Sequence, residues 1–149
     1  MRFAREFVAI WILAAMTLCV QSAGMALIIH WARTTIARGI RVLTPWRTSV
    51  LMVRFTVAMI VLNITEILLW AGFYRWQCFP TWDASFYFSA TSYSTVGYGD
   101  IVLPNIWRTL GPIESVTGVL MSGISVSGLF AILLRLLGDE TGSSTAAKT

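Results

Sequence analysis

The segment with the clearest potential for chemistry reads Thr-Val-Gly-Tyr-Gly over residues 95–99, and Asp100 follows it directly. Gly97 and Gly99 can adopt positive φ at little steric cost, whereas another residue would lose about 1–2 kcal/mol there. A glycine loop that binds phosphate lies between a strand and a helix. No strand is predicted before Gly97 and no helix directly after it, so we interpret this loop as a different kind of site.

The other groups that could react or bind a metal are isolated in the sequence. Cys19 lies inside an apolar block and Cys78 in a loop, so the two cysteines form neither a metal-ligand spacing nor a disulfide framework. His30 stands alone at the end of an apolar segment, and we interpret it as an interfacial side chain without a proton-sensing role. We therefore expect no catalytic residue, no bound cofactor and no enzymatic activity.

The composition indicates that membrane helices position residues 95–100. Of the 149 residues, 56% are hydrophobic and only 12% are charged, whereas soluble domains carry about 25% charged residues. A soluble enzyme is therefore excluded. The basic excess would suggest nucleic-acid binding in a soluble chain, but here five arginines gather between two apolar blocks, as expected of a membrane protein. We expect contacts with membrane lipids and none with nucleic acid.

Three apolar segments are long enough to cross a bilayer: residues 7–31, 50–74 and 108–137. For the first, a cleavable signal peptide is the alternative, but its apolar run continues beyond the small residues that would form the cleavage site. The predicted organisation is an N-terminal transmembrane helix in residues 1–32, a basic cytoplasmic linker in 33–49, a region of two further transmembrane helices that contains the glycine loop in 50–137, and a disordered tail in 138–149.

Polar residues inside the apolar segments are costly in a bilayer and should face protein or water. Asn63 and Glu66 lie three positions apart, on one face of the second apolar helix, and Glu66 is expected to have a buried partner. Glu114 lies near one end of the third helix. It is either an interfacial charge or a buried hydrogen-bonded carboxylate, and the interface is the slightly favoured interpretation.

Residues 82–94 are expected to form a helix that crosses about half of the membrane. Thr81 or Asp83 can cap it, and residues 84–93 contain neither Gly nor Pro. Placed after this helix and between two spanning helices, residues 95–99 resemble the filter of the potassium-channel family without a substitution. The resemblance covers the outer helix 50–74, the pore helix 82–94, the filter 95–100 and the inner helix 108–137.

The resemblance implies an all-α membrane protein in which three transmembrane helices, a re-entrant pore helix and a selectivity-filter loop assemble as a tetrameric pore. A potassium ion in a narrow pore must exchange its water for oxygen ligands, which backbone carbonyls of four such loops supply. The chain has one filter motif, so a homotetramer is implied. The carbonyls expected to bind K⁺ belong to Thr95, Val96, Gly97 and Tyr98, and Gly99 completes the filter.

Residues around the filter are expected to support it. In the resemblance, an aromatic donor on the pore helix bonds the Asp that follows the filter, which assigns Tyr87 to Asp100. Ser92 stands where the family commonly has Thr, and Phe88 stands where a second aromatic donor is frequent. Bracing of the filter is expected to be weaker for these two reasons.

Gly123 on the inner helix has two interpretations. Small residues allow membrane helices to pack closely, whereas the resemblance implies a hinge at which the inner helix bends to gate the pore. With Gly123 as the hinge, the spacing of Ile124, Ser127 and Ala131 places them together on the side that lines a water-filled cavity.

The expected function is passive, potassium-selective conduction across the membrane. A non-conducting interaction subunit of a heteromeric channel is the alternative, and a transporter with four pore repeats in one polypeptide fits this single-motif chain less well. Charge predicts a multi-pass cell-membrane protein with its N-terminus outside and its C-terminus cytoplasmic. The residues that set this orientation are Arg33, Arg38, Arg41, Arg47 and Arg54.

Overall fold

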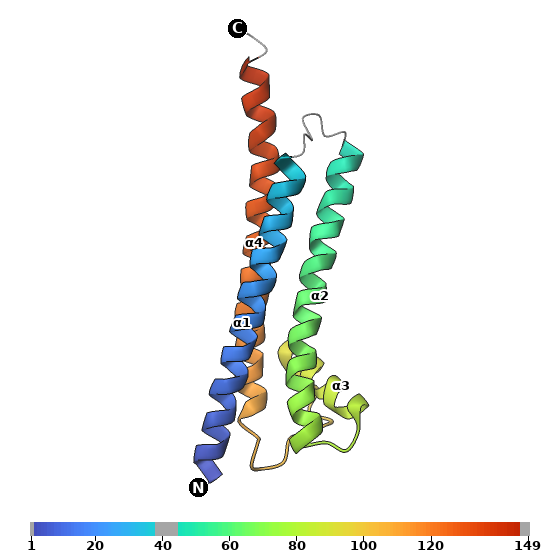
Figure 1. Cartoon of the computed structure of the whole chain (residues 1–149). Helices are drawn as coiled ribbons and strands as arrows, with labels where there is room; N and C mark the ends of the chain where they lie inside the picture. Colours follow the sequence, from blue (N-terminus) through green and yellow to red (C-terminus); the bar gives the residue numbers. More distant parts are fainter. Residues whose placement is uncertain (1, 38–44, 147–149) are drawn as a thin grey trace.

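Three long helices lie side by side in the computed structural model, and a short fourth helix packs against one end of the bundle (Figure 1). The structure describes residues 2–37 and 45–146. The helices are α1 (Arg2–Ala37), α2 (Pro45–Gln77), α3 (Trp82–Tyr93) and α4 (Leu110–Ala146). The described part of the chain contains no strand, which agrees with the predicted all-α class.

Each long helix includes a stretch that is long and apolar enough to cross a membrane. These stretches are Arg5–Thr35, Thr48–Gln77 and Leu110–Leu134. The prediction of three transmembrane helices is confirmed. Because α3 has only 12 residues, about 18 Å at 1.5 Å per residue, it is too short to cross a hydrocarbon core of about 30 Å.

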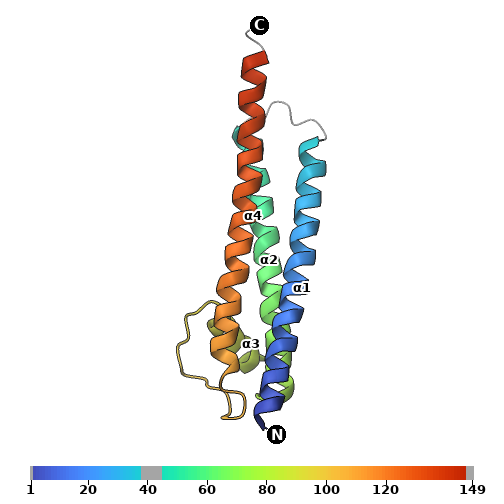
Figure 2. The same ribbon diagram turned by 90° about the vertical axis from the view of Figure 1, so that its left-hand side faces the viewer.

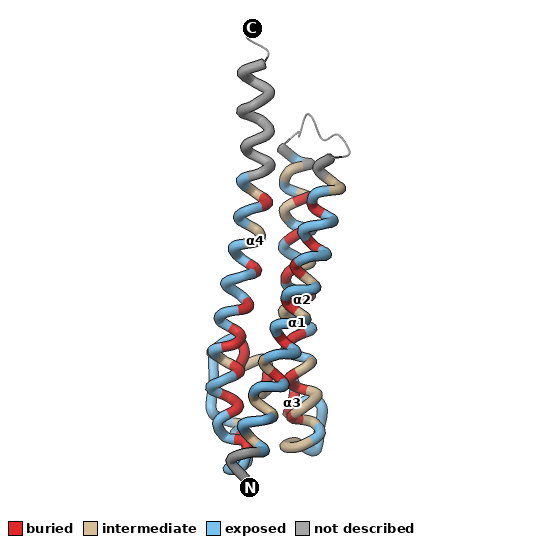
Figure 3. The backbone as a smooth tube through the Cα atoms, turned by 60° about the vertical axis from the view of Figure 1, so that its left-hand side comes forward, coloured by how far each residue is buried: buried red, intermediate tan, exposed pale blue. Residues whose placement is uncertain are grey.

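Buried residues line the inner faces of the bundle (Figure 3). Many large apolar side chains are also exposed on its outside. One core cluster lies among α1, α2 and α4, and includes Met25, Phe55, Leu62 and Ile132. A second cluster lies at the α3 end of the bundle and includes Leu13, Trp70, Tyr74, Trp107 and Leu110. The exposed apolar exterior suits a lipid solvent, which would not drive such side chains inward.

The two helices that flank the basic linker are longer than the apolar segments predict. α1 continues to Ala37 and α2 begins at Pro45, so the helices include part of the segment assigned to the linker, and residues 38–44 lie outside the described residues. Pro45 occupies the first position of α2, where its fixed φ suits a helix and its missing N–H costs no hydrogen bond. The apolar pattern marks the membrane crossing rather than the helix end.

The prediction of a disordered tail over residues 138–149 is wrong as far as Ala146, because α4 continues to that residue. Residues 147–149 lie outside the described residues. Extending an existing helix forms one hydrogen bond per residue without a new nucleation cost. Gly138 lowers helix stability by only about 1 kcal/mol, and no proline follows it. In Figure 1 this end of α4 projects beyond the other helices.

Two views place the N-terminus at the same end of the bundle as α3, and the C-terminus at the opposite end (Figures 1 and 2). α3 begins after Thr81, whose side chain accepts a hydrogen bond from the Ala84 amide at 3.3 Å. Of the two caps that the sequence allowed, the structure uses Thr81. The cap fixes the start of α3. The C-terminal end of α3 leads directly into residues 95–100.

Candidate functional site

The loop after α3 has an unusual backbone. The φ angles of Thr95, Gly97 and Gly99 are 62°, 51° and 77°, so every second residue is in the left-handed region. The two glycines were predicted to adopt such angles. Positive φ at every second residue turns the backbone in a way that an extended strand or a helix does not, and backbone carbonyls that point to one axis can serve as ligands of a cation.

Hydrogen bonds suspend this loop from the end of α3. The Gly97 amide donates to the Thr91 carbonyl and the Thr95 amide donates to the Ser92 carbonyl, both at 3.0 Å. The C-terminal end of a helix carries partial negative charge. The loop therefore lies where a cation is favoured, and its residues from Thr95 to Asp100 are exposed in the single chain.

A hydrogen bond between Tyr87 of α3 and Asp100 attaches the far end of the loop to α3, as predicted. The Tyr87 hydroxyl donates to Asp100 Oδ2 at 2.9 Å, and this bond raises the pKa of Tyr87 above its ordinary value near 10. The Tyr87 ring also stacks on the Tyr98 ring, with centroids 6.5 Å apart and planes 15° apart. Tyr87 thus supports the loop through both its ring and its hydroxyl.

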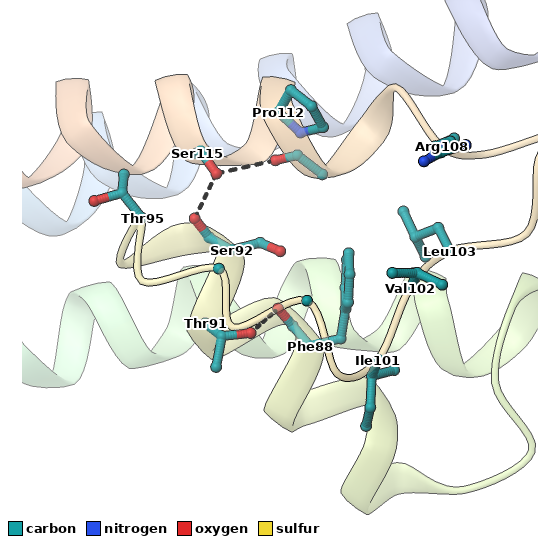
Figure 4. A pocket seen from close by; sticks show the side chains of 13 residues that line it. Phe88, Thr91, Ser92, Thr95, Ile101, Val102, Leu103, Arg108, Pro112 and Ser115 are labelled. Atoms are coloured by element: carbon teal, nitrogen blue, oxygen red, sulfur yellow. Dashed lines mark hydrogen bonds between the residues drawn. The ribbon is translucent and has the colours of Figure 1, made fainter.

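Ser92 supports the loop through its backbone, which the sequence did not indicate. The Ser115 hydroxyl of α4 lies 2.7 Å from the Ser92 carbonyl oxygen and 3.1 Å from the Gly111 carbonyl oxygen (Figure 4). Phe88, which has no hydrogen-bonding group, packs edge-on against Tyr74 with ring centroids 5.1 Å apart. Apolar packing replaces a second aromatic donor at this position.

Glu66 has the buried partner that its position predicted. Its Oε2 is hydrogen-bonded by the hydroxyl of Tyr93, the last residue of α3. The same hydroxyl lies 3.2 Å from Asn63 Oδ1, so both polar residues of that α2 face meet one tyrosine. This contact ties the outer helix to the residue from which the loop departs.

Glu114 is fully buried, so the favoured interfacial interpretation is wrong. The Tyr74 hydroxyl donates to its Oε2 at 2.8 Å, and the Ser89 hydroxyl lies 2.5 Å from its Oε1. Burying a carboxyl group without such partners would cost several kcal/mol. Since Tyr74 belongs to α2 and Ser89 to α3, one side chain of α4 joins three helices behind the loop. The polar residues opposite it in α2 and α3 were the available sequence signal.

A pocket of about 470 Å³ lies between the loop, α3 and the start of α4. Figure 4 shows Phe88, Thr91 and Ser92 on one side and Pro112 and Ser115 on the other. Thr95, Gly97 and Gly99 also line it. The loop is therefore held against α3 by hydrogen bonds but is separated from α4 by open space in the single chain.

The glycines of α4 differ in their surroundings. A Cβ at Gly118 would overlap the carbonyl oxygen of Tyr93, and a Cβ at Gly128 would lie 2.8 Å from Met25 Sδ, so both allow close packing. A Cβ at Gly123 would meet nothing within 4 Å. Close packing within the chain thus explains Gly118 and Gly128, whereas it gives no reason for Gly123.

The side of α4 predicted to line a cavity faces away from the rest of the chain. Ile124, Ser127 and Ala131 are all exposed, while Met121, Ser125 and Ile132 on the other side are buried. The exposed side is apolar except for Ser127, whose hydroxyl bonds the Gly123 carbonyl at 2.8 Å. It is available to water or to another copy of the chain.

Residues 57–135 match the family model described as ion channel. The match runs from within α2, through α3 and the loop, into α4, and it includes more than half of the chain. The chain belongs to this family of ion channels. No curated protein and no solved structure matches it. The family match leaves α1 outside and covers parts of α2 and α4 together with α3 and the loop.

Proposed function

We propose that this channel conducts K⁺ selectively and passively, and that residues 95–99 form its selectivity filter. The observation that supports the proposal most directly is the alternation of positive φ at Thr95, Gly97 and Gly99 in a Thr-Val-Gly-Tyr-Gly run. Rings of backbone carbonyls replace the hydration shell of K⁺ in filters of this sequence. The ligands are the carbonyls of Thr95, Val96, Gly97 and Tyr98, and no further cofactor is required.

The proposed assembly is a homotetramer. One loop supplies one quarter of each carbonyl ring, so four copies are needed to surround an ion. Tyr98 is 72% and Val96 52% exposed in the single chain. The exposed side of α4 with Ile124, Ser127 and Ala131 extends from the loop toward the opposite end of the bundle. Assembly around the loop would cover these surfaces and leave a cavity lined by α4 on the cytoplasmic side.

The proposed orientation places the filter end outside the cell membrane. The N-terminus shares that end (Figure 1), and the last part of α1, with Arg33, and the first part of α2, with Arg54, lie toward the other end. Cytoplasmic loops carry an excess of Lys and Arg, so the N-terminus is outside and the C-terminus is cytoplasmic. The Tyr87–Asp100 bond then lies at the external mouth of the pore.

The test is cation flux into proteoliposomes that contain the purified, cross-linked tetramer. We expect K⁺ and Rb⁺ to enter far faster than Na⁺ and Li⁺. Gly97→Ala should abolish selectivity or conduction, because a side chain at this positive φ costs about 1–2 kcal/mol in each chain. Gly72→Ala is the matched control: a Cβ there meets nothing within 4 Å in α2, and flux should not change.

Three results would contradict the proposal. Equal Na⁺ and K⁺ flux through the confirmed tetramer would show a channel without potassium selectivity. Absence of flux from the tetramer, with flux restored on adding a second membrane protein, would show that the chain is a non-conducting subunit. If Gly97→Ala left both flux and selectivity unaltered, residues 95–99 would not line the ion path.

A further inference from the structure

α1 lies outside the family match, yet it packs along both α2 and α4. The two views in Figures 1 and 2 show it beside both helices over much of its length. Its buried residues Thr17, Gln21, Met25 and Ile28 recur at steps of three and four, so they form one face. α1 is therefore a permanent neighbour of the inner helix within each chain.

Contacts with the outer helix fix the position of α1. The indole N–H of Trp70 donates to Thr17 Oγ1 at 3.0 Å. About two turns further along, Gly24 lets α1 approach so closely that an added Cβ would overlap the Leu62 side chain. Trp31 and Phe55 pack edge to face with centroids 4.9 Å apart. These contacts extend along α2 from Phe55 to Trp70, so α1 and α2 should move as one body.

Gln21 connects this body to the inner helix on both sides of Gly123. Its Nε2 donates to the Met121 carbonyl at 3.0 Å and to Ser125 Oγ at 3.1 Å. The three residues of this contact, which we name the Gln21 bridge, are 1%, 2% and 3% exposed. Because Met121 precedes Gly123 and Ser125 follows it, any bend of α4 at Gly123 changes the spacing of the two acceptors.

Stability alone is a poor explanation for a glutamine at this position. Gln21 Oε1 is buried and has no hydrogen-bond partner in the described part of the chain, and an unpaired buried acceptor is unfavourable. A leucine would fill similar space without that cost. The amide is instead placed so that its two N–H groups reach both sides of Gly123, where a Cβ would meet nothing within 4 Å.

From these contacts we infer that α1 restrains the gate, with Gln21 as a positioning residue that holds α4 straight across Gly123. The inference rests on the proposed channel function and extends it to the helix outside the family match. The restraint acts between the fixed pair α1 and α2 and the bending region of α4. Breaking the Gln21 bridge should favour the bent, open state and leave the filter unchanged.

The experiment compares Gln21→Leu with Ser22→Ala in the full-length tetramer, recorded as single channels in planar bilayers. Ser22 is the exposed neighbour and serves as the control. Gln21→Leu should raise the ratio of open to closed time at least about tenfold, since each of four chains loses two hydrogen bonds. The relative permeability to K⁺ and Na⁺ and the thermal unfolding midpoint should stay unchanged, which a purely structural role would not produce.

Ser125→Ala removes one of the two acceptors and should cause a smaller rise in open time. Added to Gln21→Leu it should cause no further rise, because the bond it removes is already absent. An additive effect would mean that Ser125 acts through another contact. An unchanged open ratio in Gln21→Leu, with selective K⁺ current in the unmodified channel, would overturn the inference and leave the proposed function intact.

Amide hydrogen exchange in lipid nanodiscs tests the same restraint without ion flux. Gln21→Leu should speed exchange at residues 122–127 of α4 several-fold, whereas Ser22→Ala should not. If the unmodified tetramer shows no K⁺ selectivity, the proposed function fails, but faster exchange still supports the restraint. Unchanged exchange at those residues would overturn it in either case.

Discussion

Thr95 is the residue whose backbone is most unfavourable in the described chain. It is the one non-glycine there with positive φ, and such an angle costs about 1–2 kcal/mol. Backbone strain of this size persists only where neighbouring contacts determine the conformation. Here the Thr95 amide is bonded to the Ser92 carbonyl and the Gly97 amide to the Thr91 carbonyl. The conformation of the loop 95–100 therefore depends on its attachment to α3.

Tyr87→Phe tests that dependence at the external end of the loop. The change removes the hydrogen bond to Asp100 but keeps the ring that stacks on Tyr98, so the loop should still form. We expect faster loss of K⁺ current during sustained recording, because Asp100 is no longer tied to α3. Tyr98→Phe is the control, since its ring remains and the Tyr87–Asp100 bond is unaltered. Equal current decay in both variants would show that the bond does not stabilise conduction.

The pH dependence of that bond follows from its direction. Asp100 accepts from the Tyr87 hydroxyl and raises the pKa of Tyr87. A raised pKa means that the stabilisation is complete below the ordinary value near 10 and is lost as pH rises through the higher folded value. Current decay in the unmodified channel should therefore show no component from Tyr87 ionisation between about pH 7 and 9.

Tyr74→Phe tests the buried contact behind the filter. The substitution leaves Glu114 Oε2 without its donor, and an unpaired buried group costs about 1–3 kcal/mol. The thermal unfolding midpoint of the detergent-solubilised tetramer should fall accordingly. Trp76→Phe, at a position 80% exposed on the same helix, should leave the midpoint unchanged. A midpoint unaffected by Tyr74→Phe would mean that water or another group satisfies Glu114.

Among the elements, α4 has one glycine in close contact with α3 and another with open space around it. Gly118→Ala places a methyl group against the Tyr93 carbonyl, so α3 must shift; Gly123→Ala meets nothing within 4 Å. We expect Gly118→Ala to lower the unfolding midpoint and tetramer yield. Gly123→Ala should keep both but reduce open probability, because Ala stiffens a helix by about 1 kcal/mol per chain. If open probability fell in Gly118→Ala and stayed unchanged in Gly123→Ala, the hinge would lie at Gly118.

How far the sequence predicts this molecule differs between its elements. The apolar segments predict three spanning helices because lipid imposes length and composition on each helix independently. The extent of α4 beyond residue 137 was missed, since helix propagation needs no apolar side chain. Thr95 and Glu114 were missed for another reason: their conformations depend on groups in α2 and α3 that the local sequence does not specify. The Tyr87–Asp100 bond was predicted from the family resemblance. For Glu66 the sequence predicted a buried partner but did not identify Tyr93.

For the whole molecule, the decisive measurement is orientation. Cys78 is a poor probe, because burial raises the pKa of its thiol to about 11 and the thiolate is the reactive form. In a background with Cys19→Ala and Cys78→Ala, we expect Asn105→Cys to react with an impermeant maleimide in intact cells. Trp46→Cys, 75% exposed at the opposite end in the native chain, should react only after permeabilisation. The opposite pattern would invert the proposed topology.

The length of α4 makes it a mechanical lever. From Gly123 to Ala146 the helix extends about 35 Å at 1.5 Å per residue, and its last part projects past α1 and α2 (Figure 1). A bend of about 10° at Gly123 would displace the tip by about 6 Å, since a rigid helix converts angle into distance in proportion to its length. In the proposed orientation this tip lies in the cytoplasm. A load on it, such as tension or a bound protein, would bend α4 at Gly123 with this leverage. Gln21 contacts α4 on both sides of Gly123 and would oppose that bend.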